Sequence, residues 1–139
     1  MASAMPLFAS IPRHDHLGFY SGQGLESRKV AEFLDLKKPE VARLAGVSTW
    51  SIRYDDRIPK EALEYLEQIA TIAGLVAGIF EGDVQKTSLW FRTPNPLLGQ
   101  ISPRDMIRYG RYDRLLRFVH DAIQDNSASA GSDGQSTAA

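Results

Sequence analysis

The 139-residue chain contains no cysteine, which excludes disulfides, thiolate catalysis and cysteine-bound zinc. It has no long hydrophobic run either, because Thr71, Gly74 and Gly78 interrupt the most apolar stretch, residues 69–80. That stretch is too short to span a bilayer, and the N-terminus lacks the basic and apolar regions of a secretory signal. We therefore expect a cytoplasmic protein that does not contact a membrane.

The chain also lacks an excess of either charge and any recognisable catalytic motif. Its formal net charge is −1, so a basic surface that attracts nucleic acid has to be local. There is no phosphate-binding glycine loop, no convincing Ser/His/Asp order and no His/Glu pair at metal-ligand spacing. These absences predict that the protein is not an enzyme, and we expect no cofactor and no metal.

No segment alternates with period two, and every strong periodic signal is helical, so the predicted fold class is all-α. Pro59 begins the longest helix, whose apolar positions recur every three or four residues and mark it as the central core helix. Residues 25–58 before it fit a helix–turn–helix domain. Residues 83–124 after it fit a second small helical domain, in which Asp83 is expected to cap the first helix. Residues 1–24 are expected to form an irregular arm partly packed through Leu7, Phe8, Phe19 and Tyr20. The Ser/Ala/Gly/Asp-rich residues 125–139 are expected to be a disordered tail.

Residues 38–55 have the spacing of a helix–turn–helix unit. Ala42 is small enough for a helix crossing, Gly46 tolerates a positive φ at the turn, and Ser48 or Thr49 caps the second helix. That second helix would enter a major groove. We expect DNA contacts from its exposed residues and the segment that follows: Ser48, Thr49, Trp50, Arg53, Tyr54 and Arg57.

The charges around this unit give only modest support to DNA binding. Residues 35–60 carry six cations and four anions, and Asp55 and Asp56 directly follow the expected recognition helix. Two acidic groups at that place repel phosphate. A helix–turn–helix kept for packing or dimerisation is therefore the alternative, and DNA binding would need a homodimer to supply a second half-site.

Residues 90–113 form the most distinctive segment of the chain. The Thr93-Pro94-Asn95-Pro96 string predicts a rigid turn between helices. Ser102 and Pro103 then predict a helix start, and Gly110 predicts its end. Between residues 101 and 120 there are five arginines and two aspartates, with two tyrosines among them. Arginine and tyrosine are enriched in interface hot spots, although a solvated basic face is the alternative explanation.

These elements occur in the order that is typical of one family. Trp90, Thr93-Pro94-Asn95-Pro96, Leu98-Gly99, Ser102-Pro103, Gly110 and the last amphipathic helix resemble the C-terminal toxin-binding domain of Xre/MbcA/ParS antitoxins. The resemblance covers about residues 36–123, and the helix–turn–helix unit is similar to the Xre-type unit of the same family.

The resemblance implies an antitoxin that covers the active-site cleft of a cognate, NAD-consuming RES-domain toxin. It also implies a homodimer that binds operator DNA and represses its own operon. The residues expected to bind the toxin are Arg104, Arg108, Tyr109, Gly110, Arg111, Tyr112 and Arg114. The alternatives are a helix–turn–helix regulator without a toxin and a helical scaffold without a DNA role. The small residues of helix 59–80 are an alternative surface for self-association.

Overall fold

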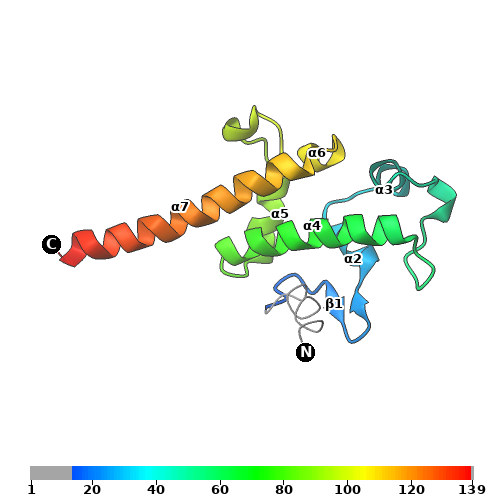
Figure 1. The fold of residues 1–139 in the computed structure, drawn as a ribbon, viewed down its shortest axis with the longest axis horizontal. Coiled ribbons are helices and arrows are strands. Elements are labelled where there is room, and N and C mark those ends of the chain that lie inside the picture. The colour runs from blue at the N-terminus through cyan, green and yellow to red at the C-terminus, as the bar shows by residue number, and fades with distance from the viewer. Residues whose placement is uncertain (1–13, 139) are drawn as a thin grey trace, which may run out of the picture.

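The computed structural model describes residues 14–138, and its side chains over residues 14–125, so Leu7 and Phe8 lie outside the described part. The described chain is helical apart from one short hairpin, which confirms the predicted all-α class (Figure 1). Its elements are β1 (Tyr20–Ser21), β2 (Gly24–Leu25), α2 (Ser27–Phe33), α3 (Lys38–Ala45), η2 (Thr49–Ser51), α4 (Lys60–Ile79), α5 (Val84–Arg92), η3 (Pro96–Leu98), α6 (Pro103–Arg108) and α7 (Tyr112–Ala138).

The hairpin lies in the segment for which the sequence predicts an irregular arm. Tyr20 pairs with Leu25 and Ser21 with Gly24 in an antiparallel register. The carboxylate of Asp15 fixes the entry to the hairpin, since its two oxygens accept hydrogen bonds of 2.9 Å from the Phe19 and Tyr20 amides. Strands of two residues are too short to produce a period-two pattern, so the sequence gives no sign of them.

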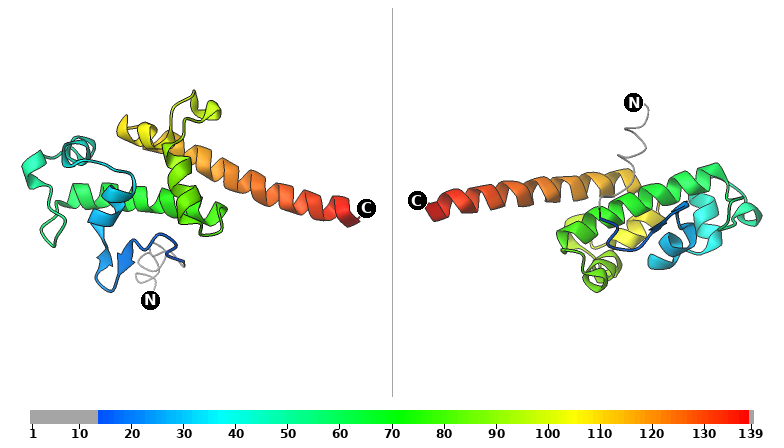
Figure 2. Two further views of the ribbon diagram at one scale, coloured as in Figure 1. Left: turned by 180° about the vertical axis from the view of Figure 1, so that it is seen from behind. Right: turned by 90° about the horizontal axis from the view of Figure 1, so that it is seen from below.

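Helix α4 is the centre of a single hydrophobic core. It contacts α2, α3, α5 and α7, which surround it along its length (Figures 1 and 2). Its buried residues are Ala62, Leu66, Ile69, Ala70, Ile72, Ala73, Val76 and Ala77. By length and composition alone α4 could also cross a membrane. This differs from the expectation, drawn from residues 69–80 of the sequence, that the apolar stretch is too short to span a bilayer. The core helix of a soluble protein has the same composition, and α4 occupies that place here.

The helix–turn–helix prediction is correct in its first half and wrong in its second. Helix α3 ends at Gly46, which has the expected left-handed backbone (φ 75°). The expected recognition helix is instead η2, a single 3-10 turn of three residues. Residues 47–52 are β-branched, short polar or aromatic, and such residues have low helix propensity. The Ser51 hydroxyl also donates to the Ser48 carbonyl at 2.6 Å, a local bond that competes with helix formation.

The helix ends in the second half of the chain follow the sequence signals. Asp83 caps α5 by accepting from the Lys86 amide at 3.0 Å, and Ser102 caps α6 by accepting from the Asp105 amide at 3.1 Å. Gly110 has a φ of 77° at the turn between α6 and α7. Helix α7 then continues to Ala138, through the segment for which the sequence predicts disorder. Extending an existing helix fixes one residue per hydrogen bond, without the cost of a new nucleus.

Candidate functional site

The loop between α5 and α6 is held in one shape by Asn95. The Asn95 carbonyl accepts from the Leu98 and Gln100 amides at 2.9 Å, and its side chain accepts from the Leu97 amide at 2.9 Å. Its own amide donates to the Ile101 carbonyl at 3.1 Å, which closes the loop. This confirms the rigid turn that the Thr-Pro-Asn-Pro string predicts. The loop presents Leu97 to solvent, with 80% of the residue exposed.

Arg104, one of the expected toxin-binding residues, is committed to contacts within the chain. Its guanidinium donates to the carbonyls of Leu34 and, at 2.8 Å, of Asp35, where α2 ends. Only 18% of its side chain is exposed. Carbonyls at a helix C-terminus carry partial negative charge and favour a cation. Arg104 therefore fastens α6 to α2, and its contact with a partner stays a prediction.

Arg108 is also used within the fold. It forms a hydrogen-bonded ion pair with Glu40 of α3 and a second one with Asp105 at 3.1 Å. In return, Arg43 of α3 donates to the Arg108 carbonyl at 2.6 Å. The two helices are therefore joined in both directions. The carboxylates explain why the pKa of the Arg108 guanidinium is raised, with the hydrogen bond to Glu40 as the largest cause.

The Glu40–Arg108 pair makes stability depend on pH. Desolvation by burial raises the pKa of Glu40, but hydrogen bonds from the Lys37 amide and Arg108 outweigh it and leave the pKa below its ordinary value of 4.5. A lowered carboxyl pKa stabilises the folded state above the ordinary pKa. That stabilisation is lost as the pH falls through the folded pKa.

Replacing Glu40 with glutamine should remove this pH dependence. At pH 7 we expect Glu40→Gln to lower the free energy of unfolding by about 1–3 kcal/mol, the usual contribution of a hydrogen bond to a charged group. Below the ordinary glutamate pKa of 4.5 the difference from wild type should shrink, because wild-type Glu40 becomes neutral too. Urea unfolding between pH 3 and pH 7 measures this, and a constant difference would contradict it.

Tyr112 belongs to the core as well, although the sequence analysis assigned it to the toxin-binding surface. It is buried at the start of α7, and its hydroxyl donates to the Gln68 carbonyl of α4 at 3.0 Å. Nearby, the Tyr65 hydroxyl donates to the Ile107 carbonyl at 3.3 Å, and burial raises the pKa of Tyr65 to about 12. These two tyrosines attach α6 and α7 to α4.

Four of the seven expected toxin-binding residues stay on the surface: Tyr109, Gly110, Arg111 and Arg114. They lie together at the junction of α6 and α7, and Arg117 extends the row along α7. Tyr109 is 61% exposed. Among the described side chains, no ion pair involves Arg111, Arg114 or Arg117. We call Tyr109–Arg117 the α6–α7 edge; its exposed cations are available to a partner.

The expected DNA-binding residues do not form one reading surface. Ser48, Thr49 and Trp50 are exposed around η2, and Trp50 is 91% exposed. Arg53 pairs with Asp55 at 3.2 Å, and about half of each side chain stays exposed. Tyr54 is half-buried, with Arg28 and Lys38 5.5 and 5.9 Å from its ring centre. The Arg57 amide donates to Asp55 at 2.9 Å, which makes a tight turn there.

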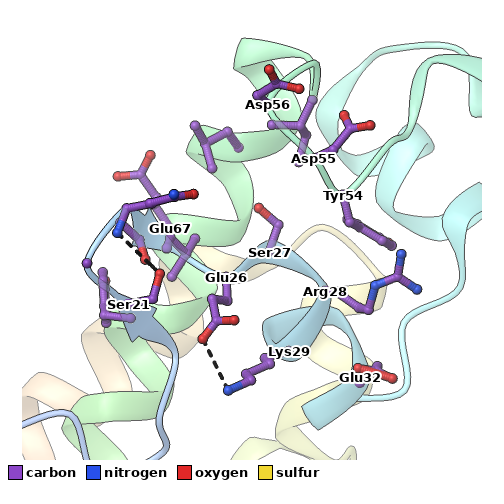
Figure 3. Close-up of a pocket in the computed structure, with 17 residues that line it drawn as sticks. Ser21, Glu26, Ser27, Arg28, Lys29, Glu32, Tyr54, Asp55, Asp56 and Glu67 are labelled. Atoms are coloured by element: carbon purple, nitrogen blue, oxygen red, sulfur yellow. Dashed lines mark hydrogen bonds and ion pairs between the residues drawn. The ribbon is translucent and has the colours of Figure 1, made fainter.

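A groove beside this segment is acidic. It lies between the hairpin, α2, the loop after η2 and α4, and the side chains around it are drawn in Figure 3. Its charged lining consists of two cations, Arg28 and Lys29, and five carboxylates: Glu26, Glu32, Asp55, Asp56 and Glu67. The excess of carboxylates repels phosphate. The folded chain thus brings acidic groups from α2 and α4 close to Asp55 and Asp56.

Two residues around α5 and the loop after it have structural roles that the sequence does not indicate. Arg92, in the last turn of α5, donates to the Phe33 carbonyl at 2.6 Å and fastens α5 to the end of α2. Leu97 stands beside Leu98, which packs against the core, so its exposure depends on the loop geometry. The partner of Arg92 is a backbone carbonyl 59 positions away, which no local pattern indicates.

Comparison with known proteins gives one structural likeness. No family model matches the chain, and no curated protein matches it. The chain is similar to a chain of the crystal structure of the M. tuberculosis MbcT-MbcA toxin-antitoxin complex. The two are 25% identical over 73% of this chain and 92% of that chain, with a TM-score of 0.47.

Proposed function

We propose that the chain is the antitoxin of a toxin–antitoxin pair and neutralises a RES-domain toxin by direct contact. The observation that carries the proposal is the α6–α7 edge, where Tyr109, Arg111 and Arg114 are exposed on a scaffold fixed by Arg104 and Arg108. Such an edge, next to the family's Thr-Pro-Asn-Pro segment, supports a role in binding another protein.

The physical properties of the edge fit a protein partner. An arginine that makes no ion pair within its own chain keeps its full donor capacity for an acidic partner, and a tyrosine contributes apolar area with a polar end. Because intramolecular bonds already fix α6 and α7, binding orders only a few side chains. In the proposed mechanism, the arginines pair with acidic residues at the entrance of the toxin cleft, and the bound antitoxin excludes NAD sterically.

Co-expression tests this function directly. The proposal requires that a neighbouring gene encodes a RES-domain protein, which should arrest growth when expressed alone, and co-expression of the chain should restore growth. A catalytically inactive form of that toxin should co-purify with the chain. Absence of a stable complex, with both proteins soluble, would overturn the proposal.

Operator binding stays a prediction, and the geometry argues for weak binding. The segment after Gly46 forms only the three-residue 3-10 turn η2 where a recognition helix would have to lie, and Arg53 pairs with Asp55. We expect Arg53→Ala to change promoter affinity less than about twofold in a gel-shift titration at low salt. A loss of about 1–3 kcal/mol would instead mean that Arg53 reads a base edge, and that this segment rearranges on DNA.

Dimerisation through α4 also stays a prediction, on a smaller surface than the sequence indicates. Ala70, Ala73 and Ala77 are buried in the core and unavailable to a second copy. Gly74 is half-buried and Gly78 is exposed, and an added Cβ atom at either position would meet nothing within 4 Å. A dimer through this face would depend on these two glycines.

A further inference from the structure

Leu97 is a large apolar side chain that the fold does not use. It is 80% exposed at the tip of the loop between α5 and α6, whereas its neighbour Leu98 packs against the core. The loop backbone does not require leucine there, because Leu97 contributes only its amide, which donates to the Asn95 side chain. A single exposed leucine is common on protein surfaces, so its surroundings have to decide what it does.

The loop around Leu97 is preorganised. The amides of Leu97, Leu98, Gly99 and Gln100 all donate to acceptors within the loop, with distances of 2.9–3.3 Å. Gly99 has a φ of 75°, and the bridge between Asn95 and Ile101 closes the two ends. A side chain on such a loop binds at little cost in conformational entropy, which is the property of an interface anchor.

The position of the loop joins it to the α6–α7 edge. Ile101 closes the loop, and Ser102 directly after it caps α6, so Leu97 is held in a fixed relation to that helix. The loop and α6 rise from the side of α4 that is opposite the hairpin (Figure 1, and Figure 2, left). The loop that carries Leu97 and helix α6, which leads into the α6–α7 edge, therefore lie on the same side of α4.

We infer that Leu97 inserts into an apolar recess of the toxin, beside the acidic rim that the α6–α7 edge contacts. This inference rests on the proposed function, and it names the apolar part of the same interface. A partner that fits this surface combines a recess for one branched side chain with carboxylates around it. The rim of the recess is expected to be acidic, because carboxylates there would complement the exposed charges of Arg111, Arg114 and Arg117. A buried apolar anchor surrounded by polar contacts is the usual organisation of an interface hot spot.

The test compares two substitutions of exposed apolar residues with aspartate. Leu97→Asp should weaken binding to the catalytically inactive RES-domain toxin at least tenfold in a calorimetric titration. Trp50→Asp is the matched control, because Trp50 is 91% exposed on η2, in the other half of the chain. It should leave the affinity within about twofold of wild type. Both substitutions replace exposed side chains, so both variants should keep the melting temperature of the wild type.

The outcomes separate this inference from the proposed function. If wild type binds the toxin and Leu97→Asp binds equally well, Leu97 is not an anchor, and the antitoxin function stands. Equal weakening by Leu97→Asp and Trp50→Asp also overturns the inference, because added negative charge alone would then explain the loss. If wild type itself does not bind, the proposed function fails first. Leu97→Met should bind nearly as well as wild type, because it keeps the apolar volume.

Discussion

Toxin neutralisation should be lost when Arg111 and Arg114 are both changed to glutamate, while the melting temperature stays that of the wild type. Both residues are exposed and form no ion pair among the described side chains, so their reversal removes nothing from the fold. Against an acidic rim, two reversed charges turn attraction into repulsion, which costs several kcal/mol of binding free energy. Growth rescue on co-expression and thermal unfolding of the purified variant measure the two effects.

A matched double reversal controls for total charge. Arg57 and Lys86 are exposed, lie outside the α6–α7 edge and make no ion pair among residues 14–125. Arg57→Glu with Lys86→Glu therefore changes the net charge by the same amount, and it should still rescue growth. If the Arg111 and Arg114 variant is soluble and rescues growth as well as this control, the edge is only a solvated basic face.

Charge reversal at Arg108 should have the opposite result, with the fold destabilised before any interface is tested. Arg108→Glu removes the pair with Glu40 and places two carboxylates side by side in a partly buried contact between α3 and α6. Because 37% of the Arg108 side chain is exposed, we expect a lower urea midpoint than wild type, but a smaller loss than removal of a fully buried ion pair would cause. Urea unfolding followed by circular dichroism measures the loss.

The reciprocal change provides the control for Arg108. In the double variant Arg108→Glu with Glu40→Arg, the pair is restored in reverse order, and part of the lost stability should return. The coupling energy of this double-mutant cycle measures the pair itself. If Arg108→Glu unfolds at the wild-type urea concentration, Arg108 does not hold α6 in place, and its assignment to the partner surface has to be restored.

The parts of the fold that the sequence predicts are those decided by local chemistry. Asp83 and Ser102 cap helices because an oxygen on a short side chain reaches a backbone amide three residues on. Gly46 and Gly110 end helices because they adopt a positive φ without steric cost. The sequence also identifies α4 as the core helix from local information, because its apolar positions recur every three or four residues and so lie on one face of the helix.

The sequence does not predict contacts between residues that are far apart along the chain. Arg104 and Arg108 look like interface residues in the sequence, but their partners Leu34 and Glu40 are 70 and 68 positions away. No local pattern shows that Arg104 and Arg108 form contacts within the fold. Arg111 and Arg114 lie in the same arginine-rich segment, yet their side chains stay exposed. The missing recognition helix is a different error, because the low helix propensity of residues 47–52 was visible in the sequence.

Because both halves of the chain contribute to one core, neither half is expected to fold as a separate fragment. Phe33 of α2 and Phe91 of α5 pack edge to face, and the carbonyls at the end of α2 accept from Arg92 and Arg104. An N-terminal fragment would lose the side chains that cover its apolar surface, and a C-terminal fragment would carry arginines without acceptors. Chimeras with a related chain should therefore exchange α2 and α3 together with α5 and α6, not as separate modules. Partner specificity is more easily transferred by changing only the loop tip and the arginine row.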